Sequence, residues 1–176
     1  MDHCRFNKDL KKSLRSPPTA THLSSAPIVT VAVDLAEASS ETNDALRTAS
    51  ARILATLPSA RLACLNVLKL ARITLDSTLD EEGHNKRVDR LVALRHWAEP
   101  LKLESHRLSV HVLEAVDPAN AILEFARANN ADQIIVGATK SSMFRNILGS
   151  VSAKVTAEAS CTVTVARPAR TRRSIP

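Results

Sequence analysis

The sequence predicts an α/β fold: a single doubly wound sheet of five parallel strands with helices on both faces. Five short runs rich in β-branched residues alternate with segments whose apolar residues recur at helical spacing, in the order βαβαβαβαβ. The runs are apolar almost throughout, which is typical of strands that are covered on both faces. Helices between such strands provide right-handed crossovers, and these make the sheet parallel.

The first half of the chain contains two strands and two helices. Residues 28–33 form the first apolar run, and residues 42–57 follow with an apolar face at helical spacing. Residues 62–68 form the second run. Beyond a polar, acidic stretch, apolar residues from Val88 to Leu101 predict a second, longer helix.

The second half repeats the alternation with shorter elements. Residues 108–113 are the third strand. Asp117, followed by a proline, predicts a helix start with a capping carboxylate. Residues 133–136 are the fourth strand, residues 151–159 a short helix, and residues 162–165 the last strand.

Charge is concentrated at the two ends of the chain. The formal net charge is +6. Residues 1–26 hold five basic and two acidic side chains and residues 167–176 hold four basic ones, so the ends carry +7 and the rest −1. We therefore expect a flexible basic tail at 1–26, one domain at 27–167 and a second basic tail at 168–176. The domain is nearly neutral and the chain has four aromatic residues, so specific nucleic-acid binding is not expected.

Other features of the composition bound the class of protein. No apolar run approaches the ~18 residues of a membrane span, and no signal-peptide pattern is present, so a cytoplasmic protein is expected. The three cysteines, Cys4, Cys64 and Cys161, are odd in number and far apart. They predict free thiols and not a disulfide framework or a metal site.

Glycine is scarce, which makes its placement informative. The chain has three glycines, where an average composition would give roughly 12. Gly137 follows the fourth strand, and Gly149 precedes the last helix with Ser150 and Ser152 beside it. A backbone open to close approach and a helix start with unpaired N–H groups are the ingredients of a phosphate site. The alternative is structural: Gly137 makes a tight turn and Ser150 caps the helix.

The loop between these glycines resembles the signature of universal stress proteins. Residues 136–152 read VGATKSSMFRNILGSVS, and the ATP-binding branch of that family has glycine, two residues, glycine, nine residues, glycine, then serine or threonine. The resemblance covers most of 27–167, including residues 32–34, 117–122 and 161–165. It implies an adenine nucleotide alpha hydrolase-like, Rossmann-like fold. Residues 90–97 resemble a bacterial subgroup often attached to serine/threonine kinases, although no kinase motif is present here.

The sequence departs from the family pattern within this loop. Lys140 replaces the second glycine, and the spacer that follows it, residues 141–148, is eight residues long. Leu35 and Ala36 replace a glycine-serine pair after the strand-one aspartate. Lys140 could meet a phosphate as a point charge, or its Cβ could block the approach that glycine permits.

The resemblance implies a role for each matching position if ATP binds. Asp34 and Val67 would border the adenine and ribose, and Gly137 would line the loop. The phosphates, with Mg²⁺ bound through them, would lie against Gly149, Ser150, Val151 and Ser152, which offer backbone N–H groups and hydroxyls. No carboxylate cluster predicts a metal that the protein holds by itself.

No residue is expected to be catalytic. The acidic residues nearest the predicted site are Asp34, Glu114 and Asp117, and none is a convincing base for activating water. His106 and His111 lie five residues apart across a loop and a strand, so a zinc site is not expected. At most, slow ATP hydrolysis is expected.

The last strand, residues 162–165, is expected at a sheet edge, and edge strands tend to pair. The resemblance implies a homodimer through this strand from Thr162 to Val165. Two interpretations stand. One is a dimeric regulator in stress response that binds adenine nucleotide. The other is a dimeric stress-related scaffold with a degenerate cleft that binds no nucleotide and works through protein partners.

Overall fold

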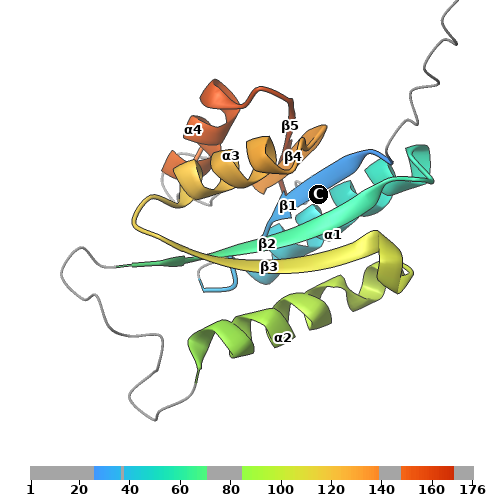
Figure 1. Cartoon of the computed structure of the whole chain (residues 1–176), viewed down its shortest axis with the longest axis horizontal. Coiled ribbons are helices and arrows are strands. Elements are labelled where there is room, and N and C mark those ends of the chain that lie inside the picture. The colour runs from blue at the N-terminus through green and yellow to red at the C-terminus, as the bar shows by residue number, and fades with distance from the viewer. Residues whose placement is uncertain (1–25, 37, 71–84, 139–147, 169–176) are drawn as a thin grey trace, which may run out of the picture.

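The computed structural model of the chain describes residues 26–36, 38–70, 85–138 and 148–168 (Figure 1). Nine helices and strands lie in these ranges: β1 (Ile28–Ala32), α1 (Ser40–Thr56), β2 (Arg61–Lys69), α2 (Lys86–Ala98), β3 (Leu108–Ala115), α3 (Pro118–Ala128), β4 (Gln133–Gly137), α4 (Ser150–Glu158) and β5 (Thr162–Ala166). The tails expected at 1–26 and 168–176 lie outside the described residues except for residues 26 and 168.

The five strands form one sheet in the order β3-β2-β1-β4-β5, and every pairing is parallel. The predicted fold class is therefore confirmed. The order reverses at β1, which pairs with β2 on one side and β4 on the other. In sheets of this kind, ligands bind beyond the carboxyl ends of the strands at such a reversal. β5 is an edge strand, as expected.

Helices cover both faces of the sheet. Figure 1 shows α3 and α4 on one side and α2 on the other. The core on the α1 and α2 side includes the fully buried Leu46, Cys64 and Leu94. The core on the α3 and α4 side is built around Ile134 and Val155. Burial on both faces explains why the strands are apolar throughout.

Local sequence sets where the helices begin and end. Ser39, Asn85 and Asp117 cap α1, α2 and α3 through their side-chain oxygens, which confirms the cap expected at Asp117. The helix expected to run to Leu101 ends at Ala98 and continues only as a 3₁₀ turn. Pro100 explains this difference, since it has no N–H to donate to the preceding turn.

No helix among the described residues is long and apolar enough to cross a membrane.

Candidate functional site

The carboxyl end of β1 carries the first predicted site residue. The backbone N–H of Val33 donates to the carbonyl of Leu65 at 2.8 Å, so the pairing with β2 continues one residue past the strand. Asp34 follows, is exposed, and accepts a hydrogen bond from the N–H of Ala36 through Oδ1 at 2.9 Å. This turn holds the Asp34 carboxylate at the strand reversal, where a ligand is expected.

β2 contributes one predicted residue and one that the sequence analysis missed. Val67 is half-buried and packs on the α3 and α4 side of the sheet. Its neighbour Asn66 is 4% exposed, and its Nδ2 donates to the carbonyl of Val33 at 2.8 Å. The Oδ1 of Asn66 has no hydrogen-bond partner among the described residues. The signal available in the sequence was an amide inside an otherwise apolar strand.

The start of α4 presents unpaired backbone donors. Gly149 is the N-cap residue, and no side chain among the described residues caps this helix. The first intrahelical bond runs from the N–H of Ala153 to the carbonyl of Gly149 at 2.8 Å. The N–H groups of residues 150–152 therefore have no partner within the helix. This is the arrangement of backbone donors and helix dipole that suits an anion.

The two serines at this helix start differ in what they offer. Ser150 is the first helical residue and is exposed, so the alternative in which its side chain caps α4 is wrong. Ser152 is 2% exposed, and its Oγ donates to the carbonyl of Gly149 at 3.1 Å. Its hydroxyl is thus used within the helix turn. Val151 is half-buried against the α3 and α4 core.

Gly137 has a packing reason to be glycine. It is the last residue of β4 and pairs with Ala166, so the expected tight turn at this position is wrong. A Cβ placed on Gly137 would lie 2.8 Å from the Cγ2 atom of Thr42, near the start of α1. Glycine therefore lets α1 approach β4 closely. Lys140 and the loop at 139–147 lie outside the described residues.

Asp117 is engaged by its surroundings. Its Oδ1 accepts hydrogen bonds from the N–H groups of Ala119 and Asn120, and its Oδ2 accepts one from Lys154 Nζ at 2.8 Å. The hydrogen bond from Lys154 and those from the backbone lower the pKa of Asp117. A carboxylate held charged in this way is a poor general base. The contact also links the start of α3 to α4.

The described thiols and histidines do not gather into a metal centre. Cys64 and Cys161 are free, and burial raises the pKa of Cys64 to about 12. Burial also raises the pKa of Cys161. Among the described residues, no group of three or more histidine, cysteine, aspartate or glutamate side chains could hold a metal ion.

Two cavities lined by described residues lie apart from the predicted nucleotide residues. One is bordered by the end of β3 and by α3, including Glu114, Asp117 and Glu124. The other lies at the opposite edge of the sheet, near the starts of β1, β2 and β3. Neither is lined by Asp34, Val67 or the start of α4.

Comparison with known proteins gives consistent results. The model of the universal stress protein family matches residues 27–167. Universal stress protein MJ0531 from Methanocaldococcus jannaschii is 36% identical over 94 residues, which are 53% of this chain and 51% of that protein. The chain thus matches about half the length of this curated relative.

Solved structures share the fold. Universal stress protein UspA from Lactobacillus plantarum aligns with a TM-score of 0.63 at 22% identity, over 81% of this chain and 98% of that one. A universal stress protein in complex with cAMP aligns at 0.58 and 18% identity, over 83% and 100% of the two chains. A family protein from Arabidopsis thaliana with AMP bound aligns at 0.54 and 18% identity, over 82% and 93%. The match of the family model over the whole α/β unit shows that this chain belongs to the universal stress protein family.

Proposed function

We propose that this chain is a dimeric regulator in stress response that binds an adenine nucleotide at the carboxyl edge of its sheet. The observation that carries the proposal is the start of α4, where the N–H groups of residues 150–152 have no side-chain cap from the part of the chain that the structure describes. These donors belong to the same edge of the sheet as Asp34, at the reversal between β1 and β4.

Each part of the ligand has matching residues. Asp34 supplies an acceptor for a ribose hydroxyl or an adenine amine, and Val67 supplies an apolar border for the base. The backbone donors from Gly149, Ser150, Val151 and Ser152 suit the phosphates, together with the exposed hydroxyl of Ser150. Mg²⁺ would enter with the phosphates of ATP. Gly137 acts indirectly, by letting α1 pack against β4.

Structural relatives support the class of ligand. One aligned universal stress protein is in complex with cAMP and another has AMP bound. ATP is our specific proposal for this chain. A cytoplasmic location and the bacterial, kinase-linked subgroup suggested by residues 90–97 belong to the same proposal.

Hydrolysis is at most a slow side reaction. Activation of water needs a base near the transferred phosphate. Asp117 is held as a helix cap and an ion-pair partner of Lys154, which leaves it unsuited to that role. We therefore assign no catalytic residue.

The second candidate is a dimeric scaffold with a degenerate cleft. The sequence observation that favours it is Lys140, which stands where the ATP-binding pattern has glycine, followed by a shortened spacer. In this case the β5 edge, from Thr162 to Val165, carries the dimer and protein partners take the place of nucleotide.

Nucleotide content separates the two candidates. The full chain is purified under native conditions and denatured, and released nucleotide is identified by chromatography and mass spectrometry. The proposal predicts adenine nucleotide near one per chain, or a melting shift with added Mg-ATP. An empty protein that shows no shift with millimolar Mg-ATP would exclude it in favour of the scaffold.

Two variants locate the bound phosphates. Ser150→Pro removes one N–H at the first helical position, where proline is compatible with the helix. It should lower nucleotide affinity while the melting temperature stays near that of wild type. Lys86→Pro makes the same backbone change at the first residue of α2 and should leave affinity unchanged.

A variant at Lys140 tests how the loop contributes to nucleotide binding. Lys140→Gly should raise nucleotide affinity if the side chain obstructs the phosphates, and should lower it if the ammonium group binds them. Unchanged affinity in Lys140→Gly would contradict both roles for this residue.

A further inference from the structure

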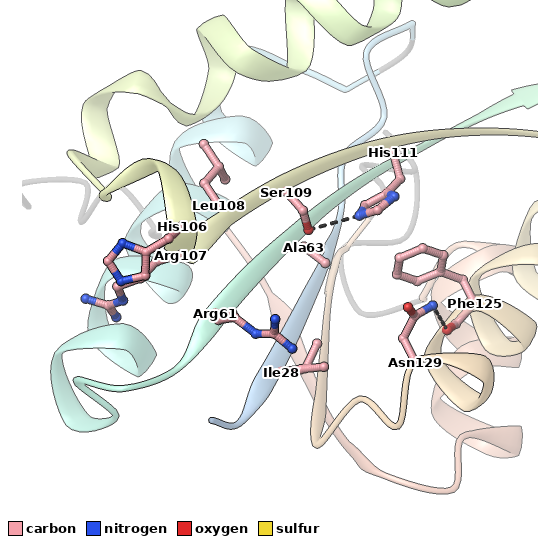
Figure 2. Close-up of a pocket in the computed structure, with 10 residues that line it drawn as sticks. All are labelled: Ile28, Arg61, Ala63, His106, Arg107, Leu108, Ser109, His111, Phe125 and Asn129. Atoms are coloured by element: carbon pink, nitrogen blue, oxygen red, sulfur yellow. Dashed lines mark hydrogen bonds between the residues drawn. The ribbon is translucent and has the colours of Figure 1, made fainter. Parts of the chain in front are cut away.

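A second cavity lies at the amino edge of the sheet, opposite the edge proposed for nucleotide. Its volume is about 170 Å³, and it is lined by residues from the starts of β1, β2 and β3 and from α3. Figure 2 shows these side chains, with Phe125 and Asn129 on one side and Arg61 in front of the strands. The cavity shares no residue with the predicted nucleotide site.

Strand register and helix periodicity place the side chains that line the cavity close to one another. Arg61 and Ala63 point to the same face of β2 because side chains alternate along a strand. Ser109 is the partner of Ala63 in β3, and His111 follows on the same face. Phe125 lies in α3 and Asn129 is the C-cap residue of that helix, one turn later; the ring centroid of Phe125 is 4.8 Å from that of His111.

Two arginines supply the charge. Arg61 begins β2 and Arg107 ends the 3₁₀ turn that precedes β3, and both line the cavity. Neither forms an ion pair with another described residue. Arg107 is held by a bond from Nε to the carbonyl of Ala60 at 3.0 Å, and its Nη2 is buried without a hydrogen-bond partner among the described residues.

Neutral polar groups complete the lining. His111 Nε2 and Ser109 Oγ lie 2.9 Å apart and share a hydrogen bond, and the Nδ2 of Asn129 donates to the carbonyl of Phe125 at 2.8 Å. No carboxylate of the described residues lines the cavity. Two described acids that do not line the cavity contact residues that do: Asp132 accepts from the N–H of Ile28 at 2.8 Å, and Glu104 pairs with His106 at 3.4 Å.

We propose that this cavity binds a small oxyanion of the phosphate class, either free phosphate or the phosphate group of a small ester. Donors come from two strands and a helix, and so approach the cavity from several directions. That arrangement suits a tetrahedral oxyanion better than a planar carboxylate, and the Arg61 guanidinium, which has no ion-pair partner among the described residues, gains most from an anion in the cavity.

The test uses the full chain at constant ionic strength. Inorganic phosphate is titrated while the ring signals of His111 and the amide signals of Ser109 and Asn129 are followed by NMR. We expect saturable shifts at these residues. Glycerol 3-phosphate, titrated in parallel, distinguishes an ester from free phosphate as the preferred source, and acetate tests whether a carboxylate binds as well. The absence of saturable shifts with both phosphate compounds would overturn the proposal, as would tighter binding of acetate.

A charge-matched pair of variants checks the assignment. Arg61→Gln should weaken phosphate binding about tenfold, because it removes a charge-assisted hydrogen bond. Arg52→Gln removes an exposed arginine from α1, on the other face of the sheet, and should have no effect. Equal weakening by both variants would show attraction to net charge only and would overturn the site. AMP binding should be unchanged in Arg61→Gln, so this result is independent of the nucleotide proposal.

Discussion

Gly137 and Thr42 meet where β4 lies under the start of α1: a Cβ on the glycine would come within 2.8 Å of the threonine Cγ2. Thr42 is 6% exposed and its side chain is stiff because it is β-branched, so it has little room to move. This contact gives a glycine of the family's signature loop a role in the packing of α1 against β4.

Gly137→Ala should therefore lower the free energy of unfolding, by about 1–3 kcal/mol, through overpacking. Urea unfolding measures this. Thr42→Ser removes Cγ2 and keeps the hydroxyl that lies 3.1 Å from Ser39 Oγ. Adding it to Gly137→Ala should restore part of the loss. Equal losses in the single and double variants would contradict the packing explanation.

If the dimer forms through β5, proline at Val163 and proline at Thr164 should have different effects on stability and assembly. The N–H of Thr162 donates to the carbonyl of Asp132, and the carbonyl of Ala166 accepts from the N–H of Ala138. The backbone N–H and C=O groups of the even-numbered residues of β5 therefore point toward β4. Because the backbone N–H and C=O groups of alternate residues in a parallel strand point to opposite sides, those of Val163 and Val165 point to the outer edge of the sheet. Val163→Pro should convert dimer to folded monomer, measured by sedimentation.

Thr164→Pro is the matched control for the edge. It removes an N–H directed at β4, and so it should lower stability as well as change assembly. An unchanged dimer in a folded Val163→Pro protein would exclude pairing through the β5 backbone.

The ion pair between Asp117 and Lys154 makes stability depend on pH. The pKa of Asp117 is lowered in the folded state, first by the hydrogen bond from Lys154. The contribution is therefore present above the unfolded pKa of about 3.9 and is lost as pH falls through the lower folded value. Asp117→Asn keeps a capping oxygen and removes the charge.

Urea midpoints of wild type and Asp117→Asn should differ at pH 7 and converge as the pH falls below about 4. A constant difference across this range would show that the carboxylate charge makes no contribution.

The buried amide of Asn66 should be needed for stability. Asn66→Leu leaves the carbonyl of Val33 without its side-chain donor, and the expected loss is about 1–3 kcal/mol in the free energy of unfolding. Chemical denaturation measures it. Asn66→Asp places a carboxylate oxygen against that carbonyl and should be at least as damaging. A Leu variant as stable as wild type would mean that water replaces the amide.

Periodicity and local turn chemistry predicted the fold because each depends on neighbouring residues. The five strands and the cap at Asp117, with Pro118 behind it, could be found in this way. The reason for glycine at 137 could not, since it depends on Thr42, 95 positions earlier in the chain. Asn66 was missed because its partner is the backbone carbonyl of Val33, 33 positions earlier and just past the end of β1.

The cavity at the amino edge of the sheet could not be predicted from the sequence either. Arg61 and His111 are fifty positions apart, and only the register between β2 and β3 brings them to one face. Ser150 was open to two interpretations because an N-cap position and a first helical position differ by one residue.

The length of β2 sets the relation between the two edges. Arg61 and Val67 lie on the same face of this strand, six residues apart, which at ~3.3 Å per residue is roughly 20 Å. A small molecule at either end cannot touch one at the other. Simultaneous occupancy is therefore sterically allowed, and any dependence of one ligand's affinity on the other must be transmitted through the protein between the two edges as a coupling free energy.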